Sequence, residues 1–186
     1  EQDDAVVRAL RDEHPAWGRG RLRRVQTLAA DGRSVVERLS EPLAGLIVEG
    51  AVFQPSQAMI PASRVTWLYT HEAVGSYLDA LGSDGLLVLN FNRVDTIEAA
   101  DSYLLGQVAT SLRERGVPFQ VLRSESGHVH VTACPTAGCL ARYAGAWSDL
   151  PVDDVTSEIG AEPDAYRVRD DTPFVGWATL DAGARA

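Results

Sequence analysis

Apolar and polar residues recur in two periods along the chain, and each period predicts a different kind of element. Residues 3–13 carry apolar side chains at helical spacing and predict a helix, whereas residues 21–29 alternate in part and predict a strand. Farther along, Ser34 is a residue type that caps helices, and Glu37 stands three residues later at the capping-box position. We therefore expect a short helix from Ser34 to about Leu39.

The middle of the chain alternates apolar strands with a helix. The run Leu43–Val48 is short and apolar, which is typical of a strand buried on both faces. Residues 50–65 contain two prolines and predict a long irregular loop. A helix is expected to begin at Thr70, and a turn at residues 82–85 leads into Leu86–Leu89, the most strongly apolar strand of the chain.

The next part of the chain predicts a long helix followed by a hairpin. Residues 95–115 have helical periodicity, and Gly116 is in the usual position after a helix C-terminus. Residues 118–122 and 128–133 predict two antiparallel strands joined by a turn at residues 124–127. This alternation of helices and strands predicts an α/β fold with a mostly parallel, doubly wound sheet and helices on both faces. In such sheets the ligand lies at the carboxyl ends of the strands.

The last part of the chain differs in charge from the rest. Residues 149–186 contain nine acidic residues and three arginines, a net charge of 3 − 9 = −6. Periodicity is weak there, and a few aromatic residues are the only candidate anchors. We therefore expect one domain over residues 1–147 and a solvated or extended acidic tail over residues 148–186.

Composition excludes several classes of function. All 17 basic residues are arginines, which excludes Schiff-base, P-loop and kinase-type lysine chemistry within this sequence. The net charge of −9 makes the chain a poor match for a phosphate backbone, so no nucleic-acid partner is expected. Because no run of about 18 apolar residues is present, we expect no membrane span and a cytoplasmic location.

Two residue pairs could carry further chemistry. His128 and His130 share one face of the predicted strand, where two imidazoles could bind a metal or simply lie on a solvated hairpin. Since the sequence offers no third ligand, we expect no metal site. Cys134 and Cys139 could close a small loop, but in a cytoplasmic domain we expect free thiols.

Six short segments follow one another in an informative order: Glu1–Val7, Ala30–Arg33, Leu46–Glu49, Leu68–Ala73, Asp84–Leu89 and Asp170–Phe174. In this order and spacing they resemble motifs of the spermidine synthase-like family, the polyamine aminopropyltransferases. This family is a branch of the S-adenosylmethionine-dependent methyltransferase fold, and the chain looks most like the bacterial versions fused to membrane segments. The resemblance covers nearly the whole chain, and it implies a Rossmann-like methyltransferase sheet with a C-terminal antiparallel hairpin.

The resemblance implies roles for five residues. Glu1 would hold the nucleoside ribose, and the turn of Asp31 and Gly32 would meet the adenine. Glu49 ends the strand that normally carries the catalytic carboxylate and would orient the acceptor, and Tyr69 would line the substrate pocket. The implied co-substrate of the full-length parent is S-adenosylmethionine or its decarboxylated form, with none expected for this chain by itself, and the implied acceptor is a polyamine or another small molecule.

Three of these residues also have plain structural interpretations. Asp31 could be an ordinary Asp-Gly turn residue, since such turns are common. Glu49 could be a strand-end residue in solvent, and Tyr69 could serve packing alone.

The chain departs from the family pattern in two ways. On this alignment it would begin beyond the first strand and the glycine-rich loop, and Val52 replaces the second acid of the catalytic segment. Both departures predict an inactive chain, so two functions stay open: a transferase domain, or a degenerate domain that keeps the fold for binding or assembly. Without a first strand, Leu43–Val48 would be an exposed edge, and we expect a homo-oligomer that pairs along it. The alternative is that residues 21–29 pair with this strand and give a monomer.

Overall fold

The computed structural model describes residues 28, 30–49, 67–91, 100–160 and 169–171. The chain divides into two compact units, residues 1–40 and residues 41–186. The predicted helix over residues 3–13, the predicted loop over residues 50–65 and nearly all of the predicted strand over residues 21–29 lie outside the described residues, as do Glu1 and Val52.

The described part of the first unit is built around a short helix, α2 (Gly32–Val36). Its N-cap is Asp31, whose Oδ2 accepts hydrogen bonds from the backbone N and the Oγ of Ser34, at 3.1 and 2.7 Å. The expectation that Ser34 caps this helix is therefore wrong, because the cap lies three residues earlier. Glu37 also forms no capping box: its carboxylate accepts from Nε of Arg33 at 2.8 Å, four residues before it.

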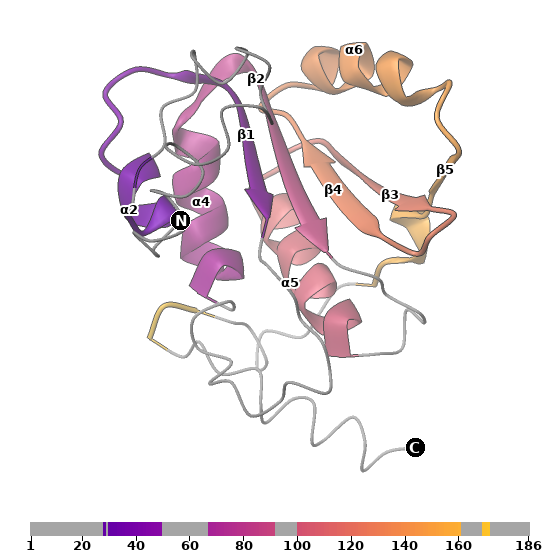
Figure 1. Ribbon diagram of the computed structural model, residues 1–186, viewed down its shortest axis with the longest axis horizontal. Coiled ribbons are helices and arrows are strands. Elements are labelled where there is room, and N and C mark those ends of the chain that lie inside the picture. Colours follow the sequence, from indigo (N-terminus) through magenta and orange to yellow (C-terminus); the bar gives the residue numbers. More distant parts are fainter. Residues whose placement is uncertain (1–27, 29, 50–66, 92–99, 161–168, 172–186) are drawn as a thin grey trace, which may run out of the picture. The chain divides into compact units, whose positions relative to one another are not determined.

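The second unit is a mixed α/β fold around a five-stranded sheet (Figure 1). Its strands are β1 (Leu43–Glu49), β2 (Leu81–Phe91), β3 (Phe119–Ser124), β4 (Val129–Ala133) and β5 (Val152–Asp154), in the order β1-β2-β4-β3-β5. Its helices are α4 (His71–Asp79), α5 (Ala100–Glu114) and α6 (Ala137–Trp147), with short 3₁₀ turns η4 (Trp67–Tyr69) and η5 (Thr156–Glu158). Only β1 and β2 run parallel among the described strands, so this sheet is mixed rather than mostly parallel.

Helix α4 forms the connection between the two parallel strands. Thr70 caps it as the sequence predicts, with Oγ1 accepting the backbone N–H of Ala73 at 3.1 Å. Strand β2 begins at Leu81, directly after the helix, so the predicted turn at residues 82–85 is wrong. Gly85 instead lets the strands approach closely, since a Cβ there would lie 2.7 Å from the carbonyl oxygen of Leu43.

The predicted long helix and hairpin are confirmed over the described residues. Helix α5 is buried all round over residues 104–112, and its buried apolar residues are Leu104, Leu105, Val108, Ala109 and Leu112. It ends before Gly116, which has the positive φ of 65° expected at that position. Strands β3 and β4 pair antiparallel, with Val121 opposite Val131, and Gly127 in the connecting turn has a φ of 83°.

The core lies against one face of the sheet. Leu87, Leu89 and Phe91 alternate along β2 and are buried, as are Val121 and Val131 on the neighbouring strands. Helices α4 and α5 contact each other and the sheet on this side. Because side chains alternate along a strand, the intervening residues of β2 belong to the opposite face, where the candidate site lies.

Strand β1 is an edge strand among the described strands, where it pairs with β2 alone. The expectation of burial on both faces is wrong: Ile47 is 68% exposed, and Val48 is the buried residue of the strand. An apolar run predicts a strand well, but burial depends on which elements cover it, and that information is not local.

The acidic segment after Trp147 contributes to the sheet. Strand β5 pairs antiparallel with β3, and Arg123 lies within 4 Å of two carboxylates, those of Asp153 and Glu158. Neither β5 nor helix α6 was predicted from the sequence. No described helix is long and apolar enough to cross a membrane.

A disulfide joins Cys134, just after β4, to Cys139 in the first turn of α6. The expectation of free thiols is therefore wrong. Thr136 caps α6 by accepting the backbone N–H of Cys139, which brings the two Cα atoms to 5.8 Å. This spacing lies within the usual range for a disulfide.

Reduction of this disulfide is expected to lower the free energy of unfolding by about 2 kcal/mol, because the bond closes a short loop in the unfolded chain. Denaturant unfolding with and without a reductant measures the difference. A double variant with Cys134→Ser and Cys139→Ser should not respond to the reductant. Two free thiols per chain in unfolded, unreduced protein would contradict the disulfide.

Candidate functional site

Three polar residues lie side by side where the parallel strands end. The sheet register places Glu49, the last residue of β1, opposite Asn90 on β2, and Asn90 opposite His130 on β4. Residues in register on adjacent strands share a face of the sheet. We call Glu49, Asn90 and His130 the strand-end row. It lies at the carboxyl ends of β1 and β2, whose arrowheads are side by side in Figure 1.

A hydrogen bond orients the imidazole of this row. Nδ1 of His130 lies 2.8 Å from Oδ1 of Asn90. Burial lowers the pKa of His130, the charge of His128 lowers it further, and the charge of Glu49 acts in the opposite direction. The imidazole is therefore neutral at pH 7, since its pKa lies below the ordinary value of 6.5.

Tyr69 connects the start of α4 to the same strand ends. Its hydroxyl donates to the backbone carbonyl of Asn90 at 3.0 Å, and its ring lies 5.0 Å from that of Phe91, centroid to centroid. Tyr69 is almost fully buried. These contacts fit the packing interpretation of Tyr69, and they fix the start of α4 against the carboxyl end of β2.

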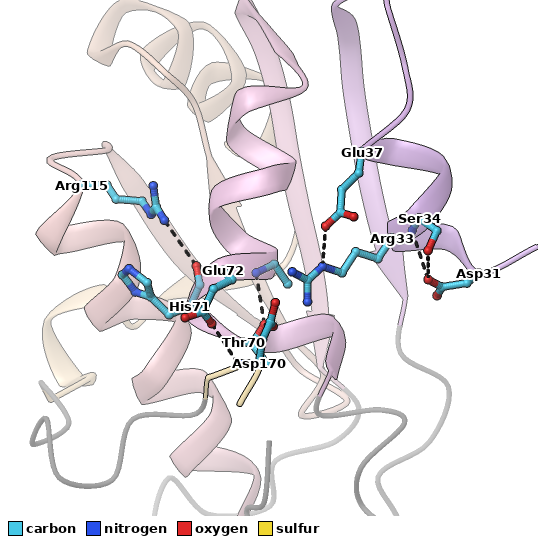
Figure 2. Close-up of polar contacts among 10 residues, drawn as sticks. Asp31, Arg33, Ser34, Glu37, Thr70, His71, Glu72, Arg115 and Asp170 are labelled. Atoms are coloured by element: carbon cyan, nitrogen blue, oxygen red, sulfur yellow. Dashed lines mark hydrogen bonds and ion pairs between the residues drawn. The ribbon is translucent and has the colours of Figure 1, made fainter. Parts of the chain in front are cut away.

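A second polar cluster surrounds the first turn of α4 (Figure 2). Oγ1 of Thr70 donates to Oδ1 of Asp170 at 2.6 Å, and the backbone N–H of Asp170 donates to Oε2 of Glu72 at 3.0 Å. Arg169 lies 3.7 Å from the same carboxylate. We call Thr70, Glu72 and Asp170 the clamp. It joins two segments 100 positions apart that the resemblance had singled out separately.

His71 belongs to a helix contact rather than to the strand-end row. Its Nδ1 lies 3.1 Å from Oγ of Ser111 and 3.8 Å from a carboxylate oxygen of Glu114, both on α5. Ser111 in turn donates to the backbone carbonyl of Gln107. Because the serine and the carboxylate approach the same ring nitrogen, this is not the relay of a serine hydrolase, in which the two use different nitrogens.

Asp31 and Gly32 lie in the first unit, and Glu49 and Tyr69 lie in the second. Hydrogen bonds from Ser34, its side chain first, lower the pKa of Asp31 although partial burial opposes them. Oδ2 of Asp31 accepts both hydrogen bonds from Ser34, and the backbone N–H and the charge of Arg33 also lower the pKa of this carboxyl. A Cβ at Gly32 would have open space around it.

The sequence predicted one member of the strand-end row and missed the role of the other two. Glu49 follows from its place after an apolar strand. Asn90 directly follows the predicted strand Leu86–Leu89, so the sequence places it at a ligand-binding strand end but assigns it no role. His130 was considered only as half of a metal pair, and the described residues hold no group of three or more His, Cys, Asp or Glu suited to a metal ion.

No protein-family model matches the chain, and no curated protein matches it significantly. Any proposal about function therefore rests on the chemistry of the strand-end row, the clamp and Asp31.

Proposed function

We propose that the chain is a spermidine synthase-like transferase domain with a Rossmann-like methyltransferase sheet. Its co-substrate is S-adenosylmethionine or the decarboxylated form, and the group transferred is an aminopropyl or a methyl group. One observation carries the proposal: Glu49 ends a parallel strand beside Asn90, at the edge where α/β sheets of this kind bind ligands. The parallel pair followed by an antiparallel hairpin also agrees with the arrangement that the resemblance implies.

Each proposed residue has its own task. Glu1, Asp31 and Gly32 contact the nucleoside, with the carboxylate of Asp31 accepting from the adenine amino group. Glu49 holds a cationic acceptor through its carboxylate, which has no hydrogen-bond or ion-pair partner among the described residues. Tyr69 positions the pocket wall, since its hydroxyl already donates to the strand end.

A second candidate is a degenerate domain that binds its ligand or a partner without catalysis. The residue that favours it is Val52, which stands where the family has its second acid. An acceptor amine must lose a proton before it attacks, and a carboxylate next to it supports that loss. With one acid replaced, binding can persist where turnover does not.

Calorimetric titration of the native protein with 5′-methylthioadenosine tests both candidates. This nucleoside is the product that aminopropyl transfer leaves behind, so a site for it supports either version of the fold. We expect saturable binding. The absence of heat at millimolar nucleoside would contradict the transferase proposal. Turnover of putrescine with the decarboxylated donor would contradict the degenerate candidate.

We also propose that the protein self-associates along the edge of β1. This edge carries Ile47, which is 68% exposed, and Glu49 is the only charged residue on the strand. Sedimentation at micromolar concentration should show a species heavier than the 20.1 kDa chain. Ile47→Lys should shift it toward monomer, whereas Leu150→Lys, at another exposed apolar position, should not. A single species near 20.1 kDa for the unmodified chain would contradict this proposal.

Cytoplasmic location is part of the same proposal, because the nucleoside donor and polyamines are small intracellular metabolites of the implied reaction. The disulfide between Cys134 and Cys139 bears on it directly. Stable disulfides are rare in the reducing cytoplasm. A thiol assay on protein taken from cells under non-reducing conditions distinguishes the two cases, and a fully oxidised pair would count against the cytoplasm.

A further inference from the structure

The imidazole of His130 is held in one tautomer by its neighbour. An amide oxygen only accepts hydrogen bonds, so the contact with Oδ1 of Asn90 requires the ring proton on Nδ1. The other ring nitrogen, Nε2, then carries a lone pair. It has no hydrogen-bond partner among the described residues.

The charges around this lone pair favour a cation. The groups whose charge reaches His130 are Glu49 on β1 and His128 on its own strand, while Asn90 and Leu122 flank it without charge. An anion would be repelled by Glu49 and would find no donor on Nε2. An ammonium group offers a positive charge to the carboxylate and N–H donors to the imidazole and the carboxylate.

We propose that the strand-end row binds one primary ammonium group of the acceptor, with Glu49 balancing its charge and Nε2 of His130 accepting one of its N–H groups. Asn90 is a positioning residue, since it keeps Nε2 free of a proton. The inference rests on the proposed function and adds His130 to it.

Through the same contact, Nε2 of His130 can accept the proton that the ammonium group of the acceptor loses during transfer. The N–H bond breaks, the proton moves to Nε2, and the electron pair left on the amine nitrogen forms the new bond to the donor carbon. The bond from this carbon to the donor sulfur breaks at the same time, its electron pair stays on the sulfur, and the neutral thioether nucleoside leaves. The imidazolium then releases this proton to water. The neutral state of His130 at pH 7 is the state that this step requires.

Titration of the native protein with putrescine, from pH 7.5 to pH 5.0, tests the inference. Because burial lowers the pKa of His130, the ring is mainly neutral at pH 7.5 and gains its proton as the pH falls. Protonation removes the acceptor and adds a repelling charge, so putrescine affinity should fall about three- to tenfold over this range. His130→Gln keeps an acceptor and should lose this pH dependence, whereas His128→Gln, two residues away, should keep it.

A second measurement does not depend on a variant. The ¹⁵N NMR signals of the His130 ring should show the Nδ1–H tautomer, and the Nε2 signal should move on addition of putrescine but not of 1,4-butanediol. No putrescine binding, an unmoved Nε2 signal, or equal pH dependence in His130→Gln would each overturn the inference. Titration of the same samples with 5′-methylthioadenosine separates the two proposals: nucleoside binding with an unresponsive His130 contradicts this inference alone.

Discussion

Thr70→Val is expected to lower the free energy of unfolding by about 3 kcal/mol, although valine nearly preserves the shape of threonine. The hydroxyl of Thr70 is fully buried and does two things at once. It accepts the backbone N–H of Ala73 as the helix cap, which is typically worth about 1 kcal/mol. It also donates to the carboxylate of Asp170, and a hydrogen bond to a charged group is worth about 1.5–3 kcal/mol.

Denaturant unfolding of Thr70→Val, Thr70→Ser and Asp170→Ala separates the contribution of the helix cap from that of the hydrogen bond to Asp170. Thr70→Ser keeps the hydroxyl and should lose less than 1 kcal/mol, since only a methyl group is removed. Asp170→Ala removes the clamp but keeps the helix cap, so its effect should lie between those of the two Thr70 variants. If Thr70→Val stayed within about 0.5 kcal/mol of the unmodified protein, the clamp would not hold α4 in place.

Asp31→Ser is expected to weaken nucleoside binding by roughly 10- to 150-fold, which corresponds to about 1.5–3 kcal/mol for a hydrogen bond to a charged group. The substitution is chosen because serine is also a good helix N-cap, so α2 keeps its start while the carboxylate is lost. Asp31→Ala would lose both. A comparison of the two variants separates the ligand contact from the stability of the helix.

Calorimetry with 5′-methylthioadenosine provides the affinities, and circular dichroism checks that each variant is folded. Glu37→Gln is a matched control, because it removes a carboxylate from the opposite end of the same helix without touching the N-cap. If Asp31→Ser bound the nucleoside as tightly as the unmodified protein, Asp31 would be a helix cap and nothing more.

The elements with strong local signals were predictable from the sequence. Thr70 begins α4 because its side chain can cap a helix, and Gly116 follows α5 because glycine accepts a positive φ at little cost. The hairpin follows from two apolar runs around a turn that contains Gly127. In these cases a few neighbouring residues decide the conformation.

The predictions that failed concern features that depend on contacts between residues far apart in the sequence. Gly85 was assigned to a turn, but it is required where β2 approaches Leu43 of another strand. Strand β5 has three residues, too few for a period to be visible in the sequence. Cys134 and Cys139 meet because a helix begins between them, and their spacing alone did not decide the bond.

The candidate site also combines features that the sequence predicts with features that it does not. Glu49 could be placed at a strand end from the apolar run that precedes it, and this placement is confirmed. Its neighbours in the strand-end row depend on the register of two strand pairings, which a single sequence does not fix. The clamp depends on a contact between Thr70 and Asp170 across 100 positions, so the two motifs could be recognised separately but not joined.

We propose that the carboxyl ends of β1 and β2 form the ligand-binding edge of a transferase-type sheet. Amide NMR of the native protein during addition of 5′-methylthioadenosine and then putrescine tests it most directly. We expect saturable shifts of the amide signals, concentrated at Glu49, at Asn90 and His130, and in the first turn of α4. Shifts confined to β5 and α6, or no saturable shift at millimolar ligand, would contradict it.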